Sequence, residues 1–216
     1  MVVAIAGAHG KIGLRLSRIL TERGDRVLGV IRDPGQAGDL AVAGAEAVVR
    51  DLERDGAADV ADGIAGAEAI VFSAGAGPGS GAERKLTLDR DGAILMIEAA
   101  KLAGASRYVI VSSMGADPSH AGDEVFDVYL RAKGEADEAV ASSGLGYTIV
   151  RPGMLTDEPG TGRVRIGESV GRGEVSRDDV AAVLAATLTQ PATIGKRFEL
   201  VGGDDEIEAA VAKLAG

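Results

Sequence analysis

The sequence lacks cysteine altogether and has few aromatic residues. With no cysteine among its 216 residues, the chain can form neither disulfides nor thiolate metal sites, and it has no cysteine nucleophile. Two histidines, His9 and His120, are too few for a histidine metal cluster, so no metal is expected. Aromatic residues make up 3% and tryptophan is absent, which argues against a surface on which nucleic-acid bases stack.

Positive charge and long apolar runs are also scarce. Lysine and arginine number 23 against 33 acidic residues, for a net charge of −10, so we expect no nucleic-acid partner. No apolar run approaches the roughly 18 residues of a membrane span, and the apolar start Val2–Ala6 lacks the basic leader of a signal peptide. We expect a cytoplasmic protein without membrane contact.

Short apolar segments alternate with longer amphipathic ones, a pattern typical of a parallel sheet with crossover helices. The apolar segments lack polar alternation, so both faces of the sheet should be covered. Strands are expected at Val2–Ala6, Arg26–Ile31, Ala45–Val49, Ala69–Ser73, Arg107–Ser112, Tyr147–Val150 and Arg197–Val201. Helices are expected at Lys11–Arg23, Gly56–Ile64, Glu83–Ala103, Asp123–Ser142, Asp178–Thr189 and Asp205–Leu214. Glycine-rich loops are expected at Gly75–Gly81 and Pro159–Gly173.

A glycine-rich turn joins the first strand to the first helix, with the sequence Gly7-Ala8-His9-Gly10-Lys11-Ile12-Gly13. The pyrophosphate of a dinucleotide needs a tight turn, close approach of the backbone and free amide donors at a helix N-terminus. Gly7 suits the turn, Gly10 the close approach, and Gly13 the packing of the helix on the strand. A plain glycine turn is the alternative, but the strand–turn–helix context favours nucleotide binding.

The residue after the second strand separates the two nicotinamide dinucleotides. An acidic side chain there binds a ribose hydroxyl of NAD, whereas an arginine accommodates the additional phosphate of NADP. The chain reads Val30-Ile31-Arg32-Asp33, which places Arg32 at that position. We therefore expect NADP (NADPH) rather than NAD as cofactor, with Lys11 as a second charge near the phosphate.

Tyr129 and Lys133 lie four residues apart in an expected helix and so share one face. That face also carries Phe126, Ala136 and Val140, so it should point into the protein. An ammonium beside a phenol favours the phenolate, which suits general acid/base catalysis. An ordinary surface pair on an amphipathic helix is the alternative.

Ser112 and Ser113 end the fifth strand, at the carboxyl edge where open parallel sheets bind ligands. A hydroxyl there can hydrogen-bond a substrate oxygen whose charge changes in the transition state. A serine hydrolase would need a histidine base, but His120 is the only nearby histidine and the sequence has no G-x-S-x-G elbow. The pattern therefore disfavours a hydrolase.

Motifs in a specific order run along nearly the whole chain: Gly7–Gly13, Arg32, Arg50-Asp51-Leu52, Ser73-Ala74-Gly75, Asp89-Arg90-Asp91-Gly92, Ser112-Ser113, Tyr129-x-x-x-Lys133, Tyr147–Gly153 and Arg177-Asp178-Asp179-Val180-Ala181. With them the chain resembles the atypical short-chain dehydrogenase/reductase family, in its small NAD(P)H-binding branch near epimerase/dehydratase-like and NmrA-like proteins. The resemblance implies a single Rossmann-type α/β domain, residues 1–216, with a doubly wound, mostly parallel sheet of order 3-2-1-4-5-6 and a possible seventh strand. A very small substrate-side portion is expected at about residues 151–175.

The same resemblance implies roles for individual residues. Ser113, Tyr129 and Lys133 would be catalytic, and Ser113 matches the family serine better than Ser112. Asp51 and Leu52 would contact the adenine, Ala74 and Gly75 the adjoining ribose, and Lys133 the nicotinamide ribose. The implied cofactor site comprises Gly7, His9, Gly10, Lys11, Ile12, Gly13, Arg32, Asp51, Leu52, Ser73, Ala74, Gly75, Ser112, Lys133, Pro152, Gly153, Met154 and Leu155.

The implied function is an NADP(H)-dependent oxidoreductase that transfers a hydride to a small carbonyl-like substrate. Tyr129 would donate the proton, Lys133 would assist it, and Ser113 would orient the carbonyl. Two alternatives stay open: a non-catalytic NADP(H)-sensing regulator of NmrA type, which alone would require a partner protein, and a flavin or quinone reductase that does not use Tyr129. The chain after Val150 is too short for the substrate domain of extended epimerases, which makes nucleotide-sugar epimerase activity doubtful. The substrate itself is not identified.

Overall fold

The computed structural model describes residues 1–77 and 79–215, so Pro78 in the first glycine-rich loop lies outside the described part. Its main sheet has seven parallel strands: β1 (Val2–Ala6), β2 (Arg26–Ile31), β3 (Glu46–Val49), β4 (Ala69–Phe72), β5 (Arg107–Val111), β6 (Gly146–Pro152) and β10 (Lys196–Gly202). Antiparallel β8 (Arg163–Gly167) and β11 (Asp205–Glu206) extend one end. The order is β11-β8-β10-β6-β5-β4-β1-β2-β3, which confirms the expected 3-2-1-4-5-6 arrangement and its seventh strand.

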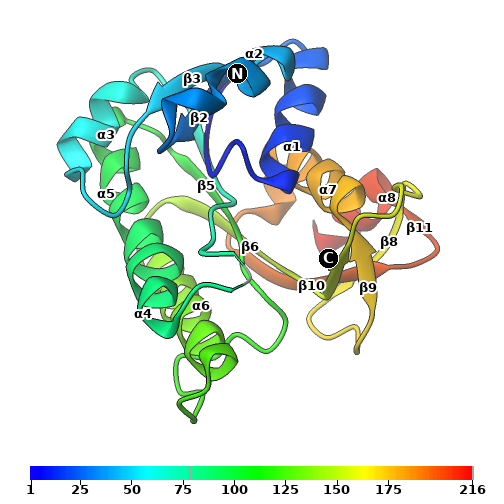
Figure 1. Ribbon diagram of the computed structural model, residues 1–216. Coiled ribbons are helices and arrows are strands. Elements are labelled where there is room, and N and C mark those ends of the chain that lie inside the picture. The colour runs from blue at the N-terminus through cyan, green and yellow to red at the C-terminus, as the bar shows by residue number, and fades with distance from the viewer. Residues whose placement is uncertain (78, 216) are drawn as a thin grey trace.

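Helices cover both faces of this sheet (Figure 1). One layer contains α1 (Lys11–Glu22), α2 (Ala37–Val42), α7 (Arg177–Thr189) and α8 (Ile207–Ala212). The other contains α3 (Ala57–Gly63), α5 (Ala93–Ala103) and α6 (Val125–Ala141), with α4 (Ala82–Arg84) and the π-helix η2 (Lys85–Gly92). Short 3₁₀ turns are η1 (Pro34–Gln36), η3 (Pro191–Thr193) and η4 (Lys213–Ala215).

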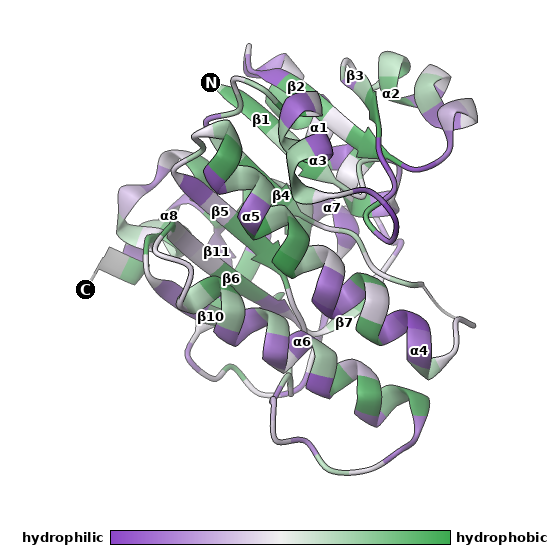
Figure 2. Ribbon diagram, turned by 90° about the vertical axis from the view of Figure 1, so that its left-hand side faces the viewer, coloured by the Kyte–Doolittle hydropathy of each residue, from purple (hydrophilic) through white to green (hydrophobic). Residues whose placement is uncertain are grey.

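The hydrophobic core is divided between the two faces of the sheet. Val3 and Ile5 of β1 pack with the α1 and α7 layer, whereas Ala4 and Ala6 pack with the α3 and α5 layer. Figure 2 shows the apolar strands between helices whose outer surfaces are more hydrophilic. This arrangement explains why the strands lack polar alternation.

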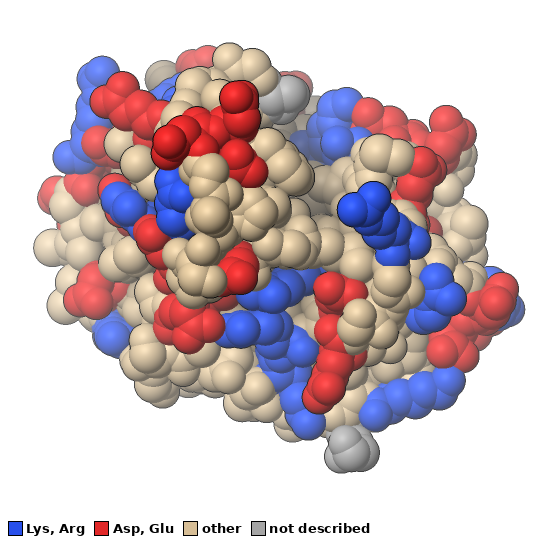
Figure 3. All heavy atoms as spheres, turned by 90° about the horizontal axis from the view of Figure 1, so that it is seen from below, with Lys and Arg blue, Asp and Glu red and all other residues tan. Residues whose placement is uncertain are grey.

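The surface carries both signs of charge. Seen from below, acidic and basic side chains are interspersed on the face that Figure 3 shows. Within the described ranges, no helix is both long enough and apolar enough to cross a membrane.

The parallel register brings the carboxyl ends of the strands to one edge. Ala6 of β1 pairs with Phe72 of β4, and Val111 of β5 pairs with Val150 of β6. The segments that follow these ends therefore meet, and Ser112 shares an edge of the sheet with the turn after β1.

Several short elements differ from the sequence-based expectation. The expected loop Pro159–Gly173 contains β8, and the expected helix from Asp205 starts as β11. A further strand pair, β7 (Met154–Thr156) and β9 (Glu174–Ser176), lies apart from the main sheet. β7, β9 and β11 have two or three residues and are too short to produce a hydrophobic period, while β8 lies in a glycine-rich, charged segment, so pairing partners define all four strands.

The third expected helix is interrupted by a π-helical stretch. The sequence predicts one continuous helix over Glu83–Ala103, but the residues from Lys85 to Gly92 form η2 between α4 and α5. π-Helical turns occur often at functional sites, because they shift side chains out of the normal helical phase. Here Lys85 and Asp89 of η2 are both buried.

Candidate functional site

The glycine turn after β1 has the tight geometry that the sequence predicts. Gly7 has a φ of +77°, and a Cβ there would lie 2.6 Å from the Cα atom of Ala74. A Cβ on Gly13 would lie 2.5 Å from the carbonyl oxygen of Gly7. Both positions therefore require glycine, whereas a Cβ on Gly10 would contact only that same carbonyl oxygen, at 3.0 Å. The backbone at Gly10 thus lies beside open space.

The N-terminus of α1 faces the same space, and no side chain caps the backbone N–H groups of its first turn. Gly10 caps this 12-residue helix without a side-chain hydrogen bond, and the first turn contains no acidic residue. Free amide groups and the helix dipole together attract anions. The turn therefore fits the pyrophosphate of a dinucleotide, with backbone rather than side chains as the main donor.

A first hollow of about 370 Å³ lies beside this turn, at the ends of β1, β2, β3 and β4. Half of the expected cofactor residues line it. They are Gly7, His9, Gly10, Arg32, Asp51, Leu52, Ser73, Ala74 and Gly75. The structure therefore brings together segments that the sequence places up to 68 positions apart.

An arginine–glutamate cluster borders the first hollow. Glu53 accepts hydrogen bonds from Arg32 and Arg84, each at 3.1 Å, and from Thr87 at 2.7 Å. Burial alone would raise the pKa of Glu53, but these partners outweigh it and hold the pKa below its usual value. The sequence does not mark Arg84 or Glu53, because their contacts join loops that are distant along the chain.

Lys11 does not lie where it is expected. Its ammonium group does not line the first hollow beside Arg32, but pairs with Asp157 at 2.5 Å. Asp157, which follows β7, also accepts a hydrogen bond from Arg177 at 3.0 Å. As the first residue of α1, Lys11 points toward the C-terminal part of the chain, and its expected role near a 2′-phosphate stays a prediction.

A second hollow of about 540 Å³ adjoins the first and shares Ser73, Ala74 and Gly75 with it. Expected residues that line it are Ile12, Ser112, Tyr129, Lys133 and Leu155. The hollow is also lined by Lys85, Asp89, Val111, Val125 and Phe126, together with Gly77, Gly79 and Ser80 of the first glycine-rich loop. No described residue of the glycine-rich segment Pro159–Gly173 lines it.

Lys133 is buried and balanced by a carboxylate. Its Nζ atom lies 3.3 Å from Asp89 Oδ1, donates to the carbonyl oxygen of Val111 at 3.1 Å, and lies 6.0 Å from the ring centroid of Tyr129. Burial would lower the pKa of Lys133, but Asp89 and the other surrounding groups raise it overall. Asp89 is therefore a functional candidate, although the sequence marks it only as part of a family motif.

The two serines differ in their surroundings. Ser112 lines the second hollow and donates to Asp137 Oδ2 at 2.9 Å, whereas Ser113 is absent from the described lining and donates to the carbonyl oxygen of Met114 at 3.2 Å. Asp137 is fully buried and pairs with Arg151 at 2.7 Å. Burial raises the pKa of Asp137, against the effects of Arg151 and Ser112.

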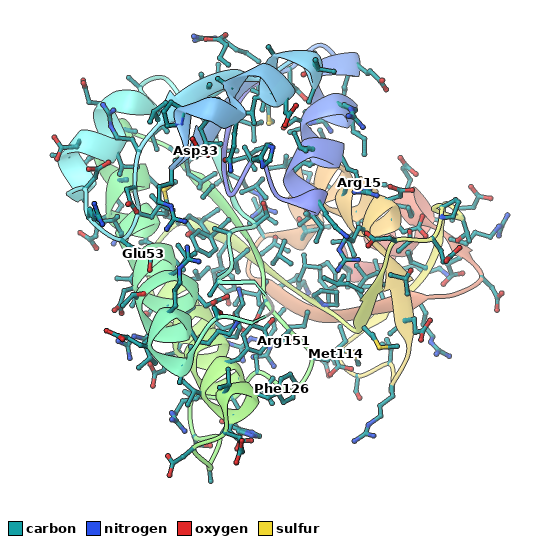
Figure 4. The ribbon with its side chains drawn as sticks, in the orientation of Figure 1. Arg15, Asp33, Glu53, Met114, Phe126 and Arg151 are labelled. Carbon is teal, nitrogen blue, oxygen red and sulfur yellow. The ribbon has the colours of Figure 1, made fainter. Side chains whose placement is uncertain are left out.

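Phe126 does not point into the core as expected. Its side chain is 65% exposed and stacks on Tyr129 with ring centroids 5.9 Å apart, whereas Ala136 and Val140 are fully buried. The first turn of α6 extends beyond the packed part of the sheet, so its apolar residues border the second hollow. Glu53 lines the first hollow and Phe126 lines the second, and Figure 4 shows the two side chains well apart.

Of the four expected cofactor residues from Pro152 to Leu155, which span the end of β6 and the start of β7, one is found in the described linings. Leu155 lines the second hollow, while Pro152, Gly153 and Met154 are absent from the described linings. Pro152 ends β6 beside Leu200, and Met154 is 62% exposed.

Comparisons with known proteins agree with this geometry. A model of the NAD(P)H-binding family matches residues 7–191. The uncharacterized sugar epimerase YhfK of Bacillus subtilis is 40% identical over 99% of this chain and 100% of its own length. A Bacillus halodurans protein named as an NAD-dependent epimerase/dehydratase has a TM-score of 0.91 and 38% identity, covering 99% of both chains. The anaerobilin reductase ChuY of Escherichia coli O157:H7 has a TM-score of 0.79 and 26% identity, over 95% of this chain and 98% of its own.

Proposed function

The chain belongs to the NAD(P)H-binding family, and we propose that it is an NADP(H)-dependent oxidoreductase of the atypical short-chain dehydrogenase/reductase type. Its oxidoreductase-like relatives include a reductase. In this proposal the dinucleotide lies along the first hollow, and a small carbonyl-like substrate lies in the second. A bound NADPH supplies a hydride.

The observation that carries the proposal is the continuity of the two hollows. They share the segment Ser73–Gly75, one beside an anion-binding helix N-terminus and the other beside Tyr129 and Lys133. A ligand with a pyrophosphate at its centre can therefore extend into both.

The first hollow would hold the adenosine half of the cofactor. Asp51 and Leu52 would contact the adenine, and the segment Ser73–Gly75 the ribose. Arg32 favours NADP over NAD, and Arg84 replaces Lys11 as the second positive charge, since both arginines already converge on Glu53.

In the second hollow, side chains of the chain would provide general acid catalysis. Tyr129 would donate a proton to the substrate oxygen, and Lys133 would favour the resulting phenolate and hold the nicotinamide ribose. Ser113 would orient the carbonyl, as the resemblance implies, but Ser112 is the better placed because it lines the hollow. Single alanine variants of these two serines separate the candidates.

We also propose that residues 151–175 form the small substrate side of the domain. Leu155 reaches the second hollow, and Pro152, Gly153 and Met154 would approach the nicotinamide only after a local shift. Asp157 ties this segment to Lys11 at the start of α1.

A flavin or quinone reductase that does not use Tyr129 is the second candidate. It is favoured by Asp89, which lies 3.3 Å from Lys133 Nζ. The carboxylate of Asp89 offsets the positive charge with which Lys133 would stabilise the phenolate of Tyr129. Such a reductase needs the dinucleotide but no proton from Tyr129.

The test combines binding with turnover. NADPH and NADH would be titrated by calorimetry, and NADPH oxidation followed with a panel of carbonyls, quinones and flavins. Turnover of carbonyls supports the first candidate, and turnover restricted to flavins or quinones supports the second. Tight NADPH binding without any turnover would contradict both and favour a cofactor-sensing regulator.

A further inference from the structure

Lys85 is a buried lysine that forms no salt bridge with an acidic side chain within residues 1–77 and 79–215. It begins η2, is 8% exposed and lines the second hollow. Its Nζ atom donates to the carbonyl oxygen of Gly77 at 2.9 Å. Burial of a charge is costly unless an opposite charge or several hydrogen bonds compensate it, so this arrangement is incomplete.

The other buried charges around the second hollow balance one another. Lys133 pairs with Asp89 at 3.3 Å, and Arg151 pairs with Asp137 at 2.7 Å. Lys85 therefore leaves one net positive charge beside the hollow. Of its three ammonium hydrogens, the Gly77 carbonyl accepts one, and among residues 1–77 and 79–215 no other acceptor takes the remaining two, which can therefore bind a ligand.

An apolar wall lies next to this charge. Lys85 Nζ is 5.5 Å from the ring centroid of Tyr129, on which Phe126 stacks. Phe126 and Val125 both line the hollow while 65% and 43% exposed. Exposed apolar side chains that border a cavity are typical of a binding site for a flat apolar group.

We infer that the second hollow takes substrates in which an aromatic or similarly flat apolar body carries a single carboxylate, and that Lys85 binds this carboxylate. One carboxylate supplies the one missing negative charge, whereas a phosphate dianion would exceed it. Phe126 and Tyr129 would contact the flat body. The inference rests on the proposed function for the reaction, but the anion site can be tested without turnover.

Benzoate and benzamide form a suitable probe pair, because they have nearly the same shape and differ in charge. Each would be titrated by calorimetry into protein saturated with NADP⁺, and tyrosine emission gives a second readout since the chain has no tryptophan. We expect benzoate to bind at least about tenfold more tightly than benzamide. Lys85→Met should remove this preference by weakening benzoate alone, and Lys85→Arg should keep much of it.

Lys101→Met is the matched control, because Lys101 is a half-exposed lysine on α5 that pairs with Glu98. It should leave both affinities unchanged. Equal binding of the two probes, no saturable binding of benzoate at about 10 mM, or equal losses for both in Lys85→Met would overturn the inference. A selective loss of NADP⁺ affinity in Lys85→Met would instead assign Lys85 to the cofactor and also overturn it.

Failure of the proposed oxidoreductase function can be distinguished from failure of the anion site at Lys85. If the protein binds no dinucleotide or oxidises no NADPH, the same titrations on cofactor-free protein still test the anion site. A benzoate preference that disappears in Lys85→Met would then uphold the site while the reductase assignment falls.

Discussion

The two hollows at the carboxyl edge are built in different ways. The first is formed mainly by segments that directly follow strands β1 to β4. The backbone N–H groups of the glycine turn are its main hydrogen-bond donors for an anion. The second is formed by side chains from α6, η2, the first glycine-rich loop and β7, with two buried ammonium groups. Both hollows combine distant segments, but the first uses the same kind of segment repeatedly, the residues that follow a parallel strand, whereas the second depends on side chains from different kinds of element.

The largest expected effect concerns the second hollow. Tyr129→Phe removes one hydroxyl and keeps the ring that stacks on Phe126. Loss of the proton donor should lower the rate of NADPH oxidation with a carbonyl substrate on the order of 10²–10⁴-fold, with NADPH affinity unchanged. Steady-state rates and calorimetry measure the two quantities.

Tyr147→Phe provides the control for this change, because Tyr147 packs against the core cluster of α3 and α5 rather than lining either hollow. A rate for Tyr129→Phe that equals that of the control would favour the flavin or quinone reductase.

A change in the first hollow should act on affinity alone. If Arg32 contacts a 2′-phosphate, the charge-assisted contact stabilises NADPH by roughly 1.5–3 kcal/mol, a preference over NADH of about tenfold to hundredfold. Arg32→Ala should remove most of it by weakening NADPH, as measured by calorimetry with both dinucleotides. Arg18→Ala, at an exposed side chain of α1 that is absent from the described linings of both hollows, should have no effect. Equal affinities of the unmodified protein for the two dinucleotides would mean that Arg32 is an ordinary loop charge.

Two glycines of the same turn should separate binding from stability. Gly10→Val places a side chain in the space beside α1, so dinucleotide affinity should fall at least about tenfold while the fold persists. Gly13→Val instead forces a Cβ against the backbone and should lower the free energy of unfolding by roughly 1–3 kcal/mol. Calorimetry and urea unfolding measure the two effects. Unchanged dinucleotide affinity in Gly10→Val would contradict the assignment of this turn.

The smallest expected effect concerns the ion pair that links the start of α1 to the substrate side. The hydrogen bond from Lys11 and the charge of Arg177 hold the pKa of Asp157 below its ordinary value of 3.8. Asp157 therefore adds stability above that value and loses it as the pH falls through its lower, folded-state pKa.

Urea unfolding between about pH 7 and pH 3 should accordingly be slightly less pH-dependent in Asp157→Asn than in the unmodified protein. Asp123→Asn, at another exposed aspartate, should leave the dependence unchanged. If the free energy of unfolding falls equally with acidification in all three proteins, the Lys11–Asp157 ion pair does not contribute to stability.

The elements differ in how well the sequence predicts them. The long strands and helices follow their hydrophobic patterns, and the glycine turn is recognised from spacing alone. The short strands β7, β8, β9 and β11 escape detection because pairing, rather than periodicity, makes them strands. Phe126 shows the same limit, since its helical phase is close to that of the buried Lys133 but the sheet no longer covers that turn.

The sequence by itself determined the layered fold and the glycine turn after β1, because these depend on short-range patterns of apolar residues and glycine, while the strand order followed from the family resemblance. Only the tertiary structure decided which charges meet: Glu53 with two arginines, Asp89 with Lys133, and Lys85 with no carboxylate in the described chain. Whether a buried charge is balanced depends on atoms that distant segments place within a few ångströms of it, and spacing along one segment carries no record of that distance.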